Sequence, residues 1–137
     1  MGGAAWQGGM VQVLGYWLPA GFYAGVIFFL SSLSHPEDEL PPFLLQEVSD
    51  KILHAVEYGI LSLLCYRAFR WAAGPAAARH AVLLAMVTAS VYGFTDEVHQ
   101  AFVPLRDASW QGWLADTVSA VLAAVGVGRM AKTSASG

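Results

Sequence analysis

Charged side chains are scarce in this chain, and its first 34 residues contain no aspartate, glutamate, lysine, arginine or histidine. Charged residues make up 12% of the 137 residues, whereas soluble proteins carry roughly 25%. Hydrophobic residues reach 56% of the chain. This composition argues against a soluble domain, and the uncharged first segment is typical of a helix that crosses a membrane.

Other absences narrow the class of function. Cys65 is the one cysteine of the chain, so no cysteine pair offers a disulfide or a structural zinc site. No helix carries two histidines at the i, i+4 spacing of a metalloprotease, and we expect neither a metal nor another cofactor. The formal net charge of −3 gives no support to nucleic-acid binding. The first segment also lacks the basic start of a cleaved signal peptide.

Four apolar segments are long enough to span a bilayer, for which a helix needs about 20 residues. They cover approximately residues 11–34, 50–71, 80–102 and 108–128. Because the connections are short, the sequence predicts an all-α integral membrane protein with four transmembrane helices in a single domain, residues 1–137. The tail rich in serine, alanine and glycine that follows is expected to be disordered.

The charges in the connections predict the orientation. Arg67, Arg70 and Arg79 lie at the second connection, and Arg129 and Lys132 lie after the fourth segment. The first connection is acidic instead, with Glu37, Asp38, Glu39 and Glu47. Basic residues favour the cytoplasmic side of a membrane. We therefore expect cytoplasmic N- and C-termini, and first and third connections that face outward.

Polar side chains nevertheless occur inside or beside three of the apolar segments. Asp50, His54 and Tyr58 are spaced at i, i+4 and i+8, which places them on one helix face with Glu57 nearby. Asp96, Glu97, His99 and Gln100 end the third segment, and Arg106 and Asp116 flank the start of the fourth. The predicted topology brings all of them to the outer third of the bilayer. Ionisable groups at that depth are costly, which indicates a functional site.

Structural roles also explain several of these residues. Asp50 fits the N-cap of its helix, and Lys51 can extend its ammonium group to the interface. His54 fits a buried histidine bonded to a carboxylate. An ion pair of Asp96 with Arg106 can close the third connection. The sequence leaves these interpretations open.

Two motifs resemble the VanZ-like membrane protein family. They are Asp50-Lys51-x-x-His54-x-x-x-Tyr58 and Asp96-Glu97-x-x-Gln100-x-Phe102-x-Pro104-x-Arg106, with Ser31-Ser32 at the end of the first segment. The resemblance extends over nearly the whole chain. It implies a bacterial-type, multi-pass protein of the cell membrane and envelope. The namesake of the family is associated with antibiotic resistance, namely reduced susceptibility to teicoplanin-type lipoglycopeptides.

The chain departs from the family pattern at three positions. Leu105 stands where the family often has glycine, Gly112 where an acid is usual, and Ser119 where glycine is usual. Asp116 does fit the polar position between the last two. The departure at Gly112 separates this chain from a full family site.

Two functions fit the polar residues. The first is binding of membrane lipids, an anionic lipid or a lipid-linked cell-wall intermediate, by a set that comprises Asp50, Lys51, His54, Tyr58, Asp96, Glu97, Gln100, Arg106 and Asp116. Arg106 would hold the phosphate. The alternative is an intramembrane enzyme that acts on a lipid head group, with His54, Asp96 and Glu97 as candidate catalytic residues.

Separately, Gly21 and Gly25 form a small-xxx-small pair, which predicts close helix contact within the bundle or in a homo-oligomer.

Overall fold

The structure, a computed structural model, describes residues 9–33, 50–106 and 108–136, and for residues 50 and 51 it describes the backbone only. Every regular element of the described residues is a helix: α1 (Met10–Ser31), α3 (Asp50–Ala72), α4 (Gly74–Arg79), α5 (Ala81–Gln100) and α6 (Trp110–Ser136). Four of them, α1, α3, α5 and α6, are long and apolar enough to cross a membrane. The prediction of an all-α chain with four candidate spans is therefore confirmed.

The end of the chain differs from the expectation. Helix α6 continues to Ser136, so the prediction of a disordered tail was wrong. The hydroxyl groups of Thr133 and Ser134 donate hydrogen bonds to the carbonyls of Arg129 and Met130, at 3.1 Å each. Because these bonds turn the hydroxyls back onto the helix's own backbone, serine and threonine are accommodated in its last turns. At 27 residues, α6 is about 40 Å long.

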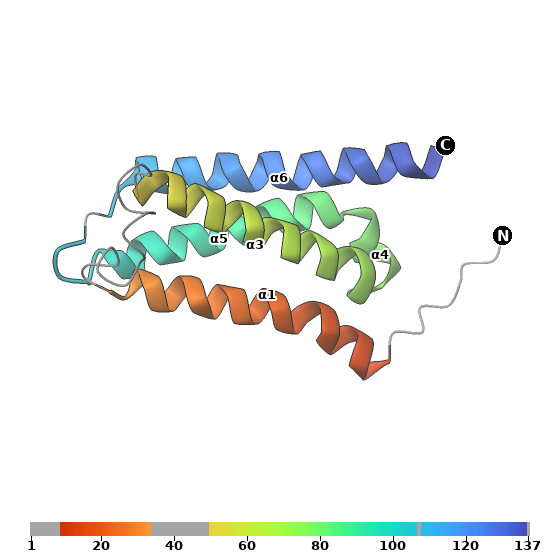
Figure 1. Cartoon of the computed structure of the whole chain (residues 1–137), viewed down its shortest axis with the longest axis horizontal. Helices are drawn as coiled ribbons and strands as arrows, with labels where there is room; N and C mark the ends of the chain where they lie inside the picture. The colour runs from red at the N-terminus through yellow and green to blue at the C-terminus, as the bar shows by residue number, and fades with distance from the viewer. Residues whose placement is uncertain (1–8, 34–49, 107, 137) are drawn as a thin grey trace, which may run out of the picture.

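Helix α3 is the central element of the bundle and packs against α1, α5 and α6. The start of α1, the short helix α4 and the end of α6 all lie at one end of the bundle, whereas residues 101–106 lie at the other (Figure 1). The short α4 was not predicted. It begins at Gly74, whose φ of 87° favours glycine, and Pro75 occupies its first turn, where no backbone N–H is required.

Small side chains line the buried faces of α5 and α6. The buried residues of α5 include Ala81, Ala85, Ala89 and Gly93, and those of α6 include Ala120, Ala124 and Gly128. The same buried face carries polar side chains at one end of each helix. They are Asp96 and Gln100 at the end of α5, and Asp116 near the start of α6. Small residues let helix backbones approach closely in a membrane. The close packing therefore continues directly into the polar end of the bundle.

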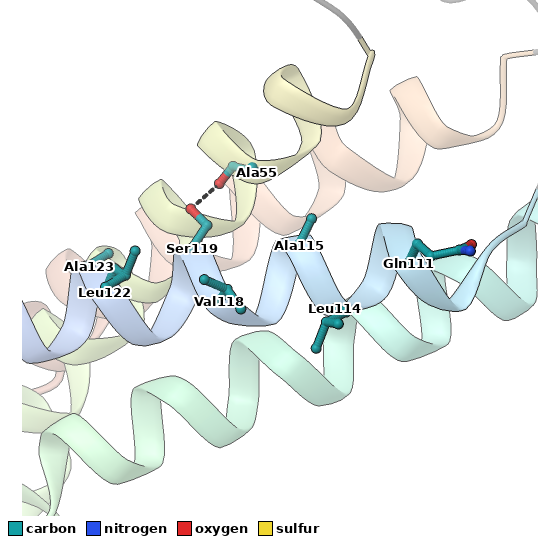
Figure 2. A pocket seen from close by; sticks show the side chains of 8 residues that line it. All are labelled: Ala55, Gln111, Leu114, Ala115, Val118, Ser119, Leu122 and Ala123. Carbon is teal, nitrogen blue, oxygen red and sulfur yellow. Dashed lines mark hydrogen bonds between the residues drawn. The ribbon is translucent and has the colours of Figure 1, made fainter.

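Hydroxyl groups link α3 to α6. The Ser62 hydroxyl donates to the Ala120 carbonyl at 2.8 Å, and the Ser119 hydroxyl donates to the Ala55 carbonyl (Figure 2). A Cβ atom at Gly59 would be 2.9 Å from Ser119 Oγ. Glycine at position 59 thus leaves the space that the serine at position 119 occupies. The departure at Ser119 is accommodated by its neighbour on α3.

Gly21 and Gly25 do not mediate helix contacts among the described residues. Both are exposed on α1, and a Cβ atom built at either position meets no atom within 4 Å. Helix α1 instead contacts α5 through Tyr92, whose hydroxyl donates to the Ala24 carbonyl at 2.5 Å. The described residues therefore do not show the predicted contact of the glycine pair within the bundle. The predicted contact with a second copy of the chain stays a prediction.

Candidate functional site

Polar side chains from three helices and one connection gather at the bundle end opposite α4. We call this set the polar cluster; it consists of His54, Glu57 and Tyr58 on α3, Asp96, Glu97 and Gln100 on α5, Arg106 in the connection, and Asp116 on α6. The antiparallel arrangement explains the meeting, because α3 and α6 begin at this end and α5 ends there (Figure 1).

Arg106 is placed by a strained turn. Leu105, the residue before it, has a φ of 64° and is the one non-glycine residue with positive φ in the described part of the chain. This left-handed conformation costs roughly 1–2 kcal/mol for a residue with a Cβ atom. The Leu105 side chain is 78% exposed, so little packing offsets that cost. The departure from glycine at position 105 therefore falls where the backbone favours glycine.

The Arg106 guanidinium points into the cluster. Its Nη2 lies 3.5 Å from His54 Nε2, which is long for a hydrogen bond. Because arginine only donates, the imidazole nitrogen that faces it is the acceptor. The buried Arg106 Nε has no hydrogen-bond partner among the described residues. A guanidinium has five N–H donors, and here it retains donors for a ligand.

Glu97 has a structural partner as well as a place in the cluster. Its Oε2 accepts a hydrogen bond of 2.8 Å from the backbone N–H of Ser109. The Ser109 hydroxyl in turn accepts one of 3.1 Å from the Gly112 N–H. Both contacts satisfy backbone donors at the start of α6, where a helix attracts negative charge. The Glu97 carboxylate therefore caps α6 and is poorly placed as a free base.

Two aspartates and a tyrosine form the buried part of the cluster. Asp96 accepts a 3.0 Å hydrogen bond from Gln100 Nε2, and both side chains are buried. Asp116 is 2% exposed, and its Oδ1 has no partner among the described residues. The fully buried Tyr58 hydroxyl lies near the Asp96 carboxyl group but reaches no hydrogen-bond geometry. Buried polar atoms without partners are costly, and the Tyr58 hydroxyl and Asp116 Oδ1 keep hydrogen-bonding capacity that no described residue uses.

The charges of the cluster are unbalanced. Glu57 lies within electrostatic range of Asp96 and Arg106, and Asp116 lies within range of Glu57, Asp96 and Glu97. Four carboxyl groups thus surround one guanidinium and one imidazole. In a medium of low dielectric constant four neighbouring carboxylates repel one another strongly. The arrangement therefore favours proton uptake by some of the carboxyl groups whenever a further negative charge enters.

Not every predicted residue joins the cluster. The side chains of Asp50 and Lys51 and the acidic residues of the first connection lie outside the described structure. His99 faces α1 instead: its Nε2 lies 3.0 Å from the Ser32 hydroxyl, and its ring lies 4.6 Å from that of Phe28, between ring centroids. The sequence did not identify Ser109 and Gly112 as partners of Glu97, because no spacing rule links a helix C-terminus to a following loop.

No group of three or more histidine, cysteine, aspartate or glutamate side chains in the described residues is arranged to hold a metal ion. The polar cluster itself contains an arginine, which can bind anions, a histidine that faces it, and four carboxyl groups.

An apolar groove runs along the seam between α3 and α6, starting level with the polar cluster (Figure 2). Its volume is about 690 Å³, and it is lined by Ala55, Gln111, Leu114, Ala115, Val118, Ser119, Leu122 and Ala123. Ala55 follows His54 in sequence and Ala115 precedes Asp116, so the groove and the cluster share the same helix turns. We call it the lateral groove.

Comparison with known proteins gave no counterpart: no protein-family model, no curated protein and no solved structure matches this chain.

Proposed function

We propose that this chain is a multi-pass protein of the bacterial cell membrane that binds an anionic lipid, or a lipid-linked envelope intermediate, through the polar cluster. Arg106 is the phosphate contact. The observation that carries the proposal is its half-buried guanidinium, whose Nε lacks a partner among the described residues. Guanidinium groups bind phosphate through paired hydrogen bonds, and a ligand phosphate would satisfy donors that the protein leaves open.

The lateral groove supports a lipid rather than a free anion. Its lining is apolar apart from Gln111 and Ser119, and the Ser119 hydroxyl is already bonded to the Ala55 carbonyl. A lipid bound with its phosphate at Arg106 could lay an acyl or prenyl chain along this groove. Each buried methylene group contributes about 0.8 kcal/mol, which adds affinity that a soluble phosphate lacks.

The orientation belongs to the same proposal: the polar cluster faces outward, and both termini are cytoplasmic. The distribution of charge supports it, since Arg67, Arg70, Arg79, Arg129 and Lys132 all lie at the opposite end of the bundle from the polar cluster (Figure 1). The resemblance to VanZ-like proteins extends the proposal to the cell envelope and to teicoplanin susceptibility. Expression in a susceptible bacterium, with Arg106→Gln as the comparison, tests that extension.

The test of binding is native mass spectrometry of the solubilised full chain with phosphatidylglycerol or a polyprenyl phosphate as the probe. We expect one lipid to bind at the polar cluster, and Arg106→Gln should weaken binding at that site by roughly tenfold or more, because hydrogen bonds to charged groups contribute about 1.5–3 kcal/mol. Arg106→Lys is the matched control that retains the charge, and it should lose less. Equal binding by wild type and Arg106→Gln, at equal melting temperature, would contradict the proposal.

An intramembrane enzyme is the second candidate, and the pairing of His54 with Arg106 favours it. An acceptor nitrogen beside a fixed cation is the arrangement of a general base next to a group that stabilises developing negative charge. All three candidate bases have partners: Glu97 at the start of α6, Asp96 with Gln100, and His54 with Arg106. Of the three, His54 is the one paired here with a cation. If the protein is an enzyme, His54→Gln should abolish release of the lipid head group while the lipid stays bound. Binding with no turnover in the wild type would exclude the enzyme.

A further inference from the structure

A second groove lies at the other end of the bundle, between the start of α5 and the end of α6. Four of its lining residues are basic: Arg79, His80, Arg129 and Lys132. None of the described residues that line it is acidic, and its volume is about 400 Å³. We call it the basic groove. Its charge is opposite to that of the polar cluster, where carboxyl groups predominate.

Close packing shapes the base of this groove. A Cβ atom at Gly128 would be 2.6 Å from Val82 Cγ2, so glycine lets α6 approach α5 closely here. Beyond this contact the wall is apolar, with Leu83, Met86 and Val125. Leu83 is 56% exposed. The basic groove therefore combines cations at the helix ends with an apolar wall that continues toward the middle of the bundle.

The other arginines at this end of the bundle have aromatic partners. The Arg67 guanidinium lies 4.8 Å from the centre of the Tyr16 ring, and that of Arg70 lies 4.9 Å from the centre of the Trp71 ring. Such stacking is a recognised cation–π arrangement. Arg79 at the end of α4 and Arg129 near the end of α6, in contrast, both line the basic groove. A general excess of basic residues does not explain why one pair stacks and the other faces a shared recess.

We propose that the basic groove binds the head group of an anionic phospholipid, with its phosphate between Arg79 and Arg129 and an acyl chain along Leu83 and Met86. Basic recesses between membrane helices suit anionic head groups. The apolar wall favours a phospholipid over inorganic phosphate, since a free ion would leave that wall unused. The site is separate from the polar cluster, at the other end of the helices, and does not depend on the function proposed there.

Native mass spectrometry of the full chain with phosphatidylglycerol tests this, with phosphatidylcholine as the uncharged probe. The groove variant is Arg79→Gln with Arg129→Gln. The matched control is Arg67→Gln with Arg70→Gln, which removes the same charge at the same end of the bundle. At about 1 kcal/mol per basic residue, the groove variant should bind phosphatidylglycerol roughly tenfold or more weakly, and the control should change by about twofold at most.

A further variant separates the lipid from the free ion. Leu83→Trp adds bulk to the apolar wall without a change in charge, and it should reduce phosphatidylglycerol binding while inorganic phosphate still fails to compete. Arg106→Gln should leave this site intact, so failure of the polar cluster to bind lipid leaves the basic groove unaffected. Equal losses in the two double variants, equal binding of phosphatidylcholine, or full competition by inorganic phosphate would overturn the proposal.

Discussion

The carboxylate of Glu97 lies against the backbone of Gly112: a Cβ atom at position 112 would be 2.5 Å from Glu97 Oε1. No side chain fits there while Glu97 keeps its hydrogen bond to the Ser109 N–H. The resemblance to VanZ-like proteins leads one to expect an acid at position 112. In this chain the carboxylate of Glu97, from α5, occupies the adjoining space, so a side chain at position 112 is accommodated only if Glu97 moves.

Substitution of Gly112 by alanine should therefore destabilise the bundle. Overpacking of this kind costs about 1–3 kcal/mol, because the Glu97 side chain must move and release the start of α6. Gly126→Ala is the matched control on the same helix, since a Cβ atom there meets nothing within 4 Å. Thermal melting in detergent should show a loss for Gly112→Ala alone. Removal of the carboxylate by Glu97→Ala should make Gly112→Ala nearly neutral, and additive losses would show that the clash does not exist.

At Leu105, in contrast, we expect a substitution that raises the stability of the protein. Its φ of 64° suits glycine, and the exposed side chain contributes little packing. Leu105→Gly should raise stability by about 1 kcal/mol. Leu105→Ala should not, because alanine retains the Cβ atom that causes the strain. Chemical denaturation of the three proteins in parallel measures the difference, and a stabilising alanine would indicate that the side chain, rather than the backbone, is unfavourable.

The sequence predicted the four long helices and the end of the bundle where the polar residues gather. Both follow from patterns along the chain: long apolar segments define the helices, and an antiparallel order brings the start of α3, the end of α5 and the start of α6 together. The roles of Leu105, Gly112 and Ser119 could not be obtained in this way. The strain at Leu105 is a property of one dihedral angle. The other two depend on another helix: Gly112 on the Glu97 side chain of α5, and Ser119 on Gly59 and the Ala55 carbonyl of α3.

Contacts between distant parts of the sequence also changed the interpretation of single residues. The Trp17 ring of α1 packs edge-on against Phe69 of α3 at 5.1 Å between centroids, and its Nε1 donates to the Ala72 carbonyl at 3.4 Å. His99 belongs by spacing with Asp96, but its ring contacts Ser32 and Phe28 of α1. Helical spacing limits which face a side chain can occupy, and packing decides which neighbour it meets.

Lipid binding at the polar cluster should strengthen as the pH falls. A bound phosphate adds negative charge beside Glu57 and Asp96 on neighbouring helices and within reach of Glu97, Asp116, His54 and Arg106. Binding is then coupled to proton uptake, and by linkage the affinity rises wherever the bound form holds more protons. Lipid titrations at about pH 6 and about pH 8 test this across the range where histidine also titrates.

The measurement is best made in the Arg129→Gln background, because this substitution lowers the affinity of the basic groove for lipid. Substitution of Glu57 by glutamine should flatten the pH dependence, since this removes one group that takes up a proton. The phosphate group of phosphatidylglycerol keeps its charge over this pH range, so titration of the lipid does not contribute to the pH dependence of the affinity. An affinity that is constant, or that rises with pH, would mean that the carboxyl groups of the polar cluster do not sense the bound lipid.

Gly21 and Gly25 yield the last prediction. They lie exposed on α1, and no described residue approaches within 4 Å of a Cβ atom at either position. If the pair mediates a homo-oligomer, as small residues do between membrane helices, then Gly21→Leu with Gly25→Leu should abolish self-association and leave the melting temperature of the monomer unchanged. Gly15→Leu is the control, because it is equally exposed and lies about 100° away around the helix. Light scattering in detergent distinguishes the monomer from the homo-oligomer. The same mass for the wild type, the double variant and Gly15→Leu would rule out this face as the interface.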